Sequence, residues 1–455
     1  MNIIDELTEA LGAETVLTGA AIGERYRSDE SLTGRALPMA VIRPRTVDEV
    51  ATALRICNAH GQPVIPQGGL TGLAGGANAS GGDVAISLEN LAGIEEIDTA
   101  AGTMTLKAGT VLEVAQNAAA EAGMLLAIDL GARGSCQIGG NISTNAGGIR
   151  VIRHGVTRDN VLGLEVVLAD GTVLSMLNKM TKNNTGYDLR QFFIGAEGTL
   201  GIITRAVLRL KPRPPARSTA LVALESYDAV VALLGGARRE LDALSAFEAM
   251  WENFVHFNCE AAGISFFETA YPFLVIIEED SDGSDAARER FEAFLGRALE
   301  DGLIVDALIA QSEKETQRFW SVREAYMMGQ LLPSLINLDV SLPIGSIGDY
   351  ARACETALLE RFPDAHVSFF GHIGDSNLHV AISVGEASAE DLHAVDEIAY
   401  DLVKAFGGSI SAEHGIGTLK RPYLGCSRSR EELDAMRRIK LALDPKGILN
   451  PGKVI

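Results

Sequence analysis

Cysteine is scarce in this sequence, and no cysteine lies close to another. The five residues, Cys57, Cys136, Cys259, Cys354 and Cys426, are odd in number and form no CxxC pair, a pattern that fits reduced thiols in a cytosol. The chain also lacks any apolar run near the roughly 20 residues that cross a bilayer. Its first residues, MNIIDELTEALGAE, contain no basic targeting region. We therefore expect a soluble, cytoplasmic protein without a membrane span.

Positive charge is also in short supply. Acidic residues number 60 against 39 basic ones, which gives a formal net charge of -21. The resulting field repels phosphate backbones and anionic lipid surfaces, so nucleic acids and membranes are disfavoured as partners. An anionic small molecule would be repelled as well, and a site for one needs positive charge concentrated locally by arginine or a metal ion.

Glycine is denser up to residue 212, with 29 of the 48 glycines, than in the rest of the chain, with 19. Short β-branched runs between residues 35 and 212 predict strands, and one helix is predicted at about 47–60, from Thr46 as N-cap to Gly61 as its stop. The proline-rich stretch at 211–218 then precedes a helix-rich region, and we place a domain boundary there. Both halves are predicted to be α+β, and we detect no internal repeat.

The second half offers two local signals and a short tail. Residues 273–279, FLVIIEE, predict a strand, and the spacing of Leu392, Val395, Ala399 and Leu402 predicts an amphipathic helix that ends at Gly407. The tail, LALDPKGILNPGKVI, is predicted to form a short helix followed by turns. A second α+β layer is therefore expected after the boundary.

The segment PVIPQGGLTGLAGGA, residues 63–77, places five glycines directly after a predicted strand. Bare backbone amides at such a turn can approach and hydrogen-bond a pyrophosphate, as a dinucleotide would require. The loop is neither a Walker A sequence, because no GK[ST] follows, nor a GxGxxG that opens a helix. NAD on a Rossmann unit is therefore disfavoured, and a flexible linker is the alternative interpretation.

Three further glycine-containing segments follow, GSCQIGGNISTNAGG (134–148), RHGVTRDNVLGLEVVLADG (153–171) and NTGYDLRQFFIGAEGTLGIIT (184–204). With these segments and the terminal LDPKGILNPGK, the chain resembles the vanillyl-alcohol oxidase and p-cresol methylhydroxylase flavoproteins, in particular their D-lactate and D-2-hydroxyglutarate dehydrogenase branch. The resemblance runs from about residue 20 to the C-terminal end of the sequence. Any one of the glycines could be an ordinary turn residue, and their ordered succession makes the resemblance specific.

The resemblance implies a two-subdomain FAD-binding domain at 1–212, with its core at about 35–212. It further implies an α+β substrate domain with an antiparallel sheet at 213–405, and a segment at 406–455 that returns to the FAD domain and completes the active site. The residues implied to contact FAD are Pro66, Gln67, Gly68, Gly69, Leu70, Thr71, Gly72, Ser135, Gly139, Asn141, Thr144, Gly147, Gly148, Glu197, Gly198, Ile202 and Asn450. Some relatives tether FAD through histidine or cysteine; residues 67–77 contain neither, so we expect dissociable flavin.

Three of the eight histidines lie in FFGHIGDSNLHVAISV and SAEHGIG. The first string predicts a hairpin in which Leu378, Val380 and Ile382 face the core and His379 faces the other side. His372 precedes the turn and could lie across from His379, and two imidazoles with a carboxylate suit a zinc-like or manganese-like ion. Satisfied surface or core histidines are the plain alternative.

The resemblance assigns roles to this group. It implies that His372, His379 and Glu413 hold a divalent ion, Zn²⁺ or Mn²⁺, and that His414 is the catalytic base. Arg323 corresponds to an arginine that binds a substrate carboxylate, and its fork geometry suits that task; a solvated arginine on a helix face is the alternative. Because adjacent strand residues point to opposite sides, Glu413 and His414 can share a site only if the backbone bends, which Gly415 and Gly417 would allow.

The implied reaction is oxidation of a D-2-hydroxy acid to the 2-keto acid by FAD with a divalent metal. The sequence departs from relatives that handle 2-hydroxyglutarate at three substrate positions, where Met327, Asn337 and Ala381 stand in place of threonine, lysine and asparagine. Without the lysine a distal carboxylate would be poorly compensated once desolvated. We therefore expect a monocarboxylate such as D-lactate, with D-2-hydroxyglutarate as the alternative substrate.

Two other functions remain open at this point. A flavin-free metal-dependent hydrolase could use the same histidines and glutamate, and a flavin subunit could act only within a larger oxidase complex. The sequence shows no iron-sulfur motif, so electrons are expected to pass to an external acceptor, a quinone, a cytochrome, an electron-transfer flavoprotein or oxygen. A second copy of the chain, in a homodimer, is the other partner left open.

Overall fold

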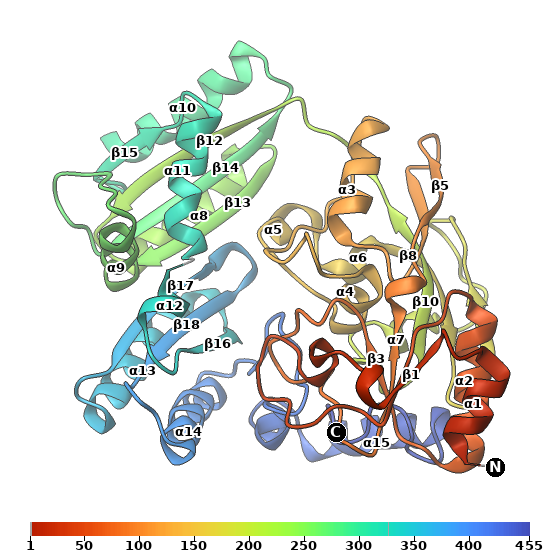
Figure 1. Ribbon diagram of the computed structural model, residues 1–455. Coiled ribbons are helices and arrows are strands. Elements are labelled where there is room, and N and C mark those ends of the chain that lie inside the picture. The colour runs from red at the N-terminus through yellow and green to blue at the C-terminus, as the bar shows by residue number, and fades with distance from the viewer. Residues whose placement is uncertain (1, 326) are drawn as a thin grey trace. The chain divides into compact units, whose positions relative to one another are not determined.

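The computed structural model describes residues 2–325 and 327–455 and divides into two compact units (Figure 1). Unit 1 comprises the chain up to Gly148, Gly155–Arg213 and Glu413–Ile455, and unit 2 comprises Ile149–His154 and Pro214–Ala412. The chain thus leaves unit 1 after Arg213 and returns to it at Glu413, where the sequence suggested 212 and 406. The short crossing at 149–154 has no counterpart in the sequence analysis.

Unit 1 contains two main sheets and a two-stranded ribbon. The first sheet has the order β1-β2-β4-β3, with strands Val16–Thr18, Ala40–Ile42, Val84–Ser87 and Val64–Gln67. The second sheet has the order β5-β6-β10-β8-β9, with strands Ile94–Asp98, Thr103–Lys107, Ile202–Arg209, Val161–Val167 and Val173–Met176. The ribbon pairs β7 (Met124–Leu125) with β11 (Lys211–Pro212).

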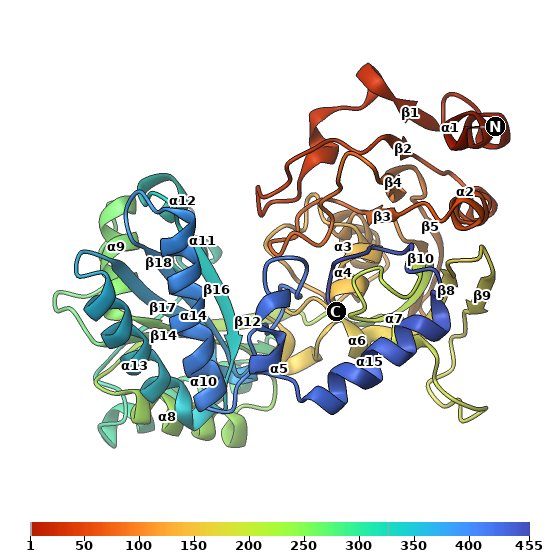
Figure 2. The ribbon, with the colours of Figure 1, turned by 90° about the horizontal axis from the view of Figure 1, so that it is seen from below.

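The helices of unit 1 surround these sheets (Figure 2). They are α1 (Ile3–Leu11), α2 (Val47–His60), α3 (Leu112–Glu121), α4 (Ile138–Thr144), α6 (Thr157–Asn160), α7 (Arg190–Phe193) and α15 (Arg430–Leu443), with 3-10 turns at Gly19–Ala21, Glu24–Arg27, Leu88–Asn90 and Arg421–Cys426. A buried apolar core joins α1, α2 and α3 to both sheets.

Helix α2 illustrates how local signals position the first glycine loop. The Thr46 side chain accepts from the backbone N–H of Glu49, and the Glu49 side chain accepts from the N–H of Thr46, which forms a capping box. Gly61 ends the helix with φ 63°, in the left-handed region. The predicted helix is therefore confirmed. The chain then enters β3, which runs parallel to β4 and delivers the glycine loop at its carboxyl end.

The C-terminal segment packs beside that loop. Leu449 forms a parallel bridge with Val64 of β3. The Asn450 side-chain amide donates to the carbonyl oxygens of Gly76 at 3.0 Å and Glu197 at 2.7 Å. The turns after α15 therefore hold two glycine-rich loops of unit 1 in a fixed relation, because one amide group bonds both.

Unit 2 is built on one antiparallel sheet of seven strands. Its order is β15-β12-β14-β13-β17-β18-β16, with strands Asp306–Ile309, Ala216–Leu224, Phe273–Ser281, Leu244–Trp251, His366–His372, Asn377–Ser383 and Ile336–Ser341. Its helices are α5 (Val151–His154), α8 (Tyr227–Glu240), α9 (Glu252–Ala262), α10 (Asp285–Glu300), α11 (Glu313–Glu324), α12 (Met328–Leu331), α13 (Ile347–Arg361) and α14 (Ala389–Ala405), with 3-10 turns at Ile344–Ser346 and Ile373–Asp375. The α+β prediction and the antiparallel sheet are confirmed.

The two faces of this sheet are covered by different helices. On one face Tyr227 of α8 stacks on Trp251, with ring centroids 5.7 Å apart. On the other face Phe254 of α9 stacks on Phe370, and the Trp320 indole of α11 donates to the buried carboxylate of Glu278 at 2.8 Å. The second face therefore mixes apolar packing with buried charge.

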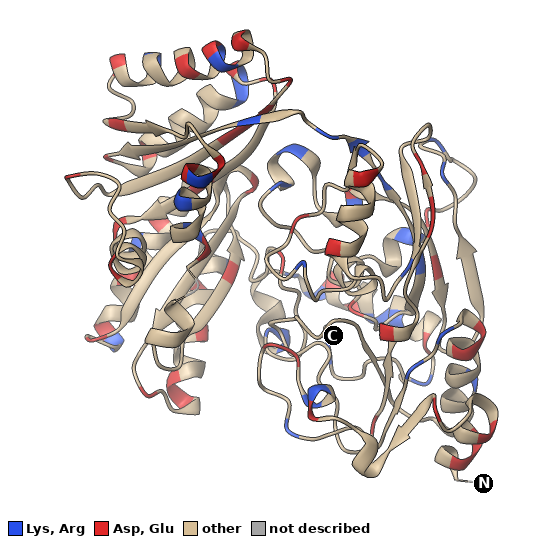
Figure 3. Ribbon diagram, turned by 45° about the horizontal axis from the view of Figure 1, so that its top comes forward, with Lys and Arg blue, Asp and Glu red and all other residues tan. Residues whose placement is uncertain are grey.

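Charged residues are spread over both units (Figure 3). Within the described part of the chain, we find no helix with the length and apolarity required to traverse a bilayer.

Candidate active site

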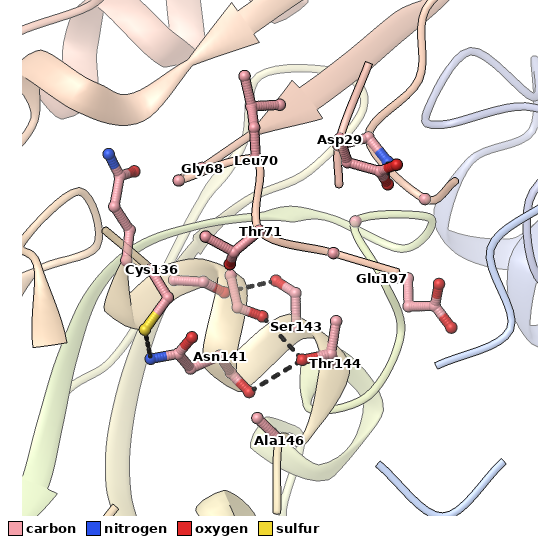
Figure 4. Close-up of a pocket in the computed structure, with 18 of the residues that line it drawn as sticks. Asp29, Gly68, Leu70, Thr71, Cys136, Asn141, Ser143, Thr144, Ala146 and Glu197 are labelled. Atoms are coloured by element: carbon pink, nitrogen blue, oxygen red, sulfur yellow. Dashed lines mark hydrogen bonds between the residues drawn. The ribbon is translucent and has the colours of Figure 1, made fainter. Parts of the chain in front are cut away.

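Unit 1 contains a cavity of about 370 Å³ that is bounded by the glycine-rich segments. Fourteen of the residues expected to contact FAD line it, namely Pro66, Gln67, Gly68, Gly69, Leu70, Thr71, Gly72, Gly139, Asn141, Thr144, Gly147, Glu197, Gly198 and Ile202. Figure 4 shows Leu70 and Thr71 of the first glycine loop on one side and Asn141, Ser143 and Thr144 of α4 on the other. Three of the four glycine segments of the sequence therefore meet at one place, and no residue of the fourth, 153–171, lines the cavity.

Three other expected residues lie behind this lining. Asn450 bonds the loops at Gly76 and Glu197, as described above. Ser135 supports the first loop, because a Cβ on Gly69 would lie 2.2 Å from the Ser135 carbonyl oxygen. Gly148 has φ 112°, which favours glycine. Direct contacts of these three residues with the cofactor remain predictions.

The lining suits a polar dinucleotide. None of the described residues around the cavity is lysine or arginine, so a pyrophosphate there would be bound by neutral donors, among them the backbone N–H groups of the glycine loop. Leu70 and Gly75 have φ values of 61° and 74°, and such left-handed residues turn successive N–H groups toward a common point. Two buried amide oxygens at the cavity, Gln67 Oε1 and Gln137 Oε1, have no hydrogen-bond partner among the described residues. They could accept hydrogen bonds from a ligand, so the residues fit FAD.

Helix α4 forms one wall through its backbone. Ser143 Oγ donates to the carbonyl of Gly139 at 2.7 Å, and the Asn141 amide donates to Cys136 Sγ at 3.5 Å (Figure 4). A Cβ on Gly139 would lie 2.8 Å from the Cβ of Ala108, so only glycine fits against that strand end without a shift. Burial raises the pKa of the Cys136 thiol, an effect that the Asn141 hydrogen bond partly opposes.

Glu413 and His414 line the same cavity. The carboxylate of Glu197 accepts the backbone N–H groups of Ile416 at 2.7 Å and Gly417 at 2.8 Å, which holds the turn after His414 against the cavity wall. Burial raises the pKa of Glu197, although these two N–H groups act in the opposite direction.

The backbone bend expected from the glycines is present in this turn. Gly415 and Gly417 have φ values of 80° and 52°. Glu413 Oε1 and His414 Nε2 are 4.0 Å apart, so the two adjacent side chains reach one region. The turn after β18 and α14 therefore delivers both groups to the cavity of unit 1.

In unit 2 the predicted hairpin is confirmed as β17, a 3-10 turn and β18. The rings of His372 and His379 have centroids 5.2 Å apart. Leu378, Val380 and Ile382 are fully buried on the opposite face, as period two predicts. The two imidazoles therefore share the polar face of the sheet at one end of the hairpin.

Two carboxylates flank these imidazoles. Glu248 of β13 is the register partner of His372, and its Oε1 lies 2.6 Å from His372 Nδ1. Asp339 of β16 is the register partner of His379, with Oδ1 4.0 Å from His379 Nδ1. Asp339 also accepts the backbone N–H of Ala412 at 3.1 Å, so it holds the end of unit 2 that precedes Glu413.

Arg323 lies on α11 and is only 8% exposed. Its Nε donates to Glu248 Oε2 at 2.7 Å, and its guanidinium lies over the Phe370 ring at 4.6 Å. Burial raises the pKa of the Glu248 carboxyl, but its interactions with His372 and Arg323 outweigh burial and lower that pKa to about 2. Arg323 is therefore buried beside His372, and it is not a solvated arginine on a helix face.

The three residues expected to set substrate size lie at different depths. Asn337 and Ala381 are register partners, two positions along from the Asp339 and His379 pair. Ala381 is fully buried in an apolar cluster with Met328, whereas Met327 is 37% exposed. Two of the three therefore border the histidines on the sheet.

Four side chains at these sites were not predicted from the sequence: Asp29 and Cys136 at the cavity, and Glu248 and Asp339 on the sheet. Glu248 and Asp339 are carboxylates within apolar strands, LSAFEAMW and INLDVS, and an acid in such a run is itself a signal of a buried partner. Asp29 is buried in a segment without regular structure, where no periodicity could identify it.

Comparison with known proteins agrees with this geometry. Residues 38–176 match an FAD binding domain, and residues 213–454 match the C-terminal domain of FAD linked oxidases. A D-2-hydroxyglutarate dehydrogenase of Xanthomonas citri pv. viticola is 39% identical over 453 residues, covering 98% of this chain and 96% of that protein. The mitochondrial D-2-hydroxyglutarate dehydrogenase of Bos taurus is 38% identical over 426 residues, covering 93% of this chain and 78% of that protein.

Solved structures extend the match in fold. p-Cresol methylhydroxylase with substrate bound superposes with a TM-score of 0.80 at 16% identity, covering 99% of this chain and 96% of that chain. The 4-ethylphenol oxidase of Gulosibacter chungangensis gives a TM-score of 0.76 at 18% identity, with the same coverage. The chain therefore belongs to the FAD-linked oxidases, within the vanillyl-alcohol oxidase and p-cresol methylhydroxylase family of flavoproteins.

Proposed function

We propose that this flavoprotein oxidises a D-2-hydroxy acid to the 2-keto acid with the help of a divalent metal ion. The observation that carries the proposal is that Glu413 and His414 line the cavity formed by the FAD-binding glycine segments. A proton acceptor beside the flavin site is what oxidation of an alcohol requires. The names of the relatives, D-2-hydroxyglutarate dehydrogenases, support the substrate class.

The proposed metal ligands are His372, His379 and Glu413. The two imidazoles, nearly perpendicular with ring centroids 5.2 Å apart, support this assignment, and nitrogen and carboxylate ligands suit Zn²⁺ or Mn²⁺. Glu413 follows directly on Ala412, whose backbone is bonded to Asp339 beside His379. We propose that this connection lets the glutamate complete the ligand set.

Each residue of the proposed site has one task. Arg323 binds the substrate carboxylate through the N–H groups that Glu248 does not use. His414 accepts the hydroxyl proton through a ring nitrogen that carries a lone pair. When bound, FAD supplies the acceptor for the hydrogen on the carbinol carbon. The divalent ion, when bound, supplies Lewis acidity that lowers the hydroxyl pKa.

We favour a small monocarboxylate such as D-lactate as the substrate, with D-2-hydroxyglutarate as the alternative. Asn337 and Ala381 border the histidines and carry no charge, so neither offers a cation to a second carboxylate. Desolvating that carboxylate without a partner would be costly. The names of the relatives favour the alternative, and the two substrates must therefore be compared directly.

A flavin-free hydrolase is disfavoured, because residues 38–176 match an FAD binding domain. Turnover of the isolated chain with an artificial dye acceptor tests the proposal. We expect activity with D-lactate, little with L-lactate, and loss of activity on chelation that Zn²⁺ or Mn²⁺ restores. Turnover unaffected by metal removal would overturn the metal assignment, and inactivity of the isolated chain with every 2-hydroxy acid would overturn the function.

A further inference from the structure

The feature that carries a further inference is the buried carboxylate of Glu248. The side chain is 1% exposed and lies between an imidazole and a guanidinium. One oxygen lies 2.6 Å from His372 Nδ1, and the other accepts from Arg323 Nε at 2.7 Å. Both carboxylate oxygens are therefore engaged, each by a residue with a separate role in the proposed site.

The contact with His372 determines where its ring protons lie. An ionised carboxylate can only accept, so the short contact requires a proton on Nδ1. In a neutral imidazole the lone pair is then on Nε2, the nitrogen that can bind a metal ion. The register pairing of Glu248 with His372 fixes this contact through the sheet backbone.

The contact with Arg323 restricts the guanidinium in the same way. The Nε–H is held by Glu248, and the plane rests on the Phe370 ring, 4.6 Å from its centroid. Phe370 in turn contacts His379, with ring centroids 4.9 Å apart. Arg323 Nη2 also lies 3.5 Å from His372 Nδ1. The guanidinium is therefore held at several points, which reduces the ordering needed when a carboxylate binds.

We propose that Glu248 is a positioning residue that couples the metal site to the carboxylate site. It holds the His372 tautomer that presents Nε2 and the Arg323 rotamer that receives the substrate carboxylate. The inference rests on the proposed function. It adds one residue, Glu248, that positions both the metal ligand His372 and the carboxylate-binding Arg323. A purely structural ion pair is the rival explanation, because removing one partner of any buried pair destabilises a protein.

Glutamine at this position separates the two explanations. Its amide has one acceptor and one donor end, so it can satisfy His372 Nδ1–H or Arg323 Nε–H but not both. If the NH₂ group faces His372, the ring must change tautomer and lose Nε2 as a ligand. If it faces Arg323, two donors meet and the guanidinium is displaced. The variant Glu248→Gln therefore weakens metal binding, substrate binding or both.

The experiment uses the full-length FAD holoprotein after metal removal. Zn²⁺ is titrated against a chromophoric chelator, Co²⁺ is added to read its visible absorption, and KM and kcat are measured for D-lactate and D-2-hydroxyglutarate. For Glu248→Gln we expect Zn²⁺ affinity to fall about 10- to 100-fold, or KM for the substrate to rise about tenfold or more with a smaller change in kcat. Flavin content should stay at the wild-type level.

A matched control is Glu279→Gln. Glu279 of β14 is also 1% exposed, and its carboxylate pairs with Arg290 at 2.8 Å. It follows Glu278, which lies on the same face of the sheet as Glu248, so Glu279 faces the opposite side. This control should lose stability to a similar extent while Zn²⁺ affinity and KM remain unchanged. Equal shifts in the two variants would overturn the proposal, as would wild-type Zn²⁺ affinity together with wild-type KM in Glu248→Gln.

Two measurements keep the test decisive if Glu248→Gln fails to fold. Glu248→Asp retains the charge but withdraws it from His372, and should show a smaller loss of Zn²⁺ affinity. In the unsubstituted, metal-free protein, ¹⁵N-labelled histidine should show the Nδ1–H tautomer for His372, and an Nε2–H tautomer would overturn the proposal. If the wild type binds no Zn²⁺, the metal assignment is wrong. The His372 tautomer and the change in KM then still test the role of Glu248.

Discussion

The carboxylate of Glu197 accepts the backbone N–H of Gly417 at 2.8 Å. It accepts the N–H of Ile416 as well, so one glutamate from the glycine-rich turn before β10 holds the turn that follows His414. Hydrogen bonds to a buried charged group are worth about 1.5–3 kcal/mol each. Glu197 is thus a link between the flavin cavity and the proposed base.

Replacing Glu197 by alanine should release that turn. We expect kcat to fall about 10- to 100-fold, because a displacement of about 1 Å of a catalytic group has effects of this size. The flavin content should fall less than the activity does. Steady-state kinetics and the flavin-to-protein absorbance ratio provide the two readings, and the exposed Glu431→Ala serves as the control. Wild-type kcat in Glu197→Ala would contradict the role.

The turn also depends on the absence of a side chain at Gly417. An added Cβ would lie 2.0 Å from the carbonyl oxygen of Ala74, which lines the cavity, and φ at this position is 52°. We expect Gly417→Ala to lose more than about 1 kcal/mol of stability and part of its flavin. Thermal unfolding and flavin absorbance measure both effects. Gly425→Ala, which has open space around its Cβ, should behave as wild type.

Flavin should be released by acid precipitation, with no yellow colour left on the polypeptide. Cys136 is the cysteine that lines the cavity among the described residues, and burial raises the pKa of its thiol, which disfavours the thiolate needed for attachment. Colour remaining in the washed precipitate would contradict this expectation. In that case Cys136→Ala and His414→Ala would identify the attached residue.

Substrate choice should respond to charge at position 337. Asn337→Lys places a cation beside the Ala381 position, and a charge-assisted hydrogen bond to a distal carboxylate is worth about 1.5–3 kcal/mol. We expect the ratio of kcat/KM for D-2-hydroxyglutarate over D-lactate to rise about tenfold or more. Asn337→Gln is the neutral control. A wild-type protein that already prefers the dicarboxylate would contradict the D-lactate proposal.

Much of this fold was predictable because its signals are local. Thr46 and Gly61 mark the ends of α2 within the sequence itself, and the alternation from Leu378 to Ile382 assigns the two faces of β18. The glycine segments likewise carry their conformational requirement with them. The convergence of three of them on one cavity followed from family resemblance, since no local rule brings distant segments together.

The parts that escaped prediction depend on pairing between distant strands. Glu248 and His372 are 124 residues apart and meet only because β13 lies beside β17. Period two assigns His379 to a face but cannot say that Asp339 lies opposite it on β16. The crossing at 149–154 is equally hidden, because Arg150 pairs with Glu278 of β14 in a different part of the sequence.

The central claim is that a D-2-hydroxy acid reduces the bound flavin with His414 as the proton acceptor. Anaerobic mixing of the holoprotein with D-lactate or D-2-hydroxyglutarate should bleach the flavin absorbance, and a chelator should prevent it. In His414→Ala the flavin should stay bound while bleaching slows about 10²- to 10⁴-fold. Equal bleaching rates in His414→Ala and wild type, or no bleaching by any D-2-hydroxy acid, would contradict the account.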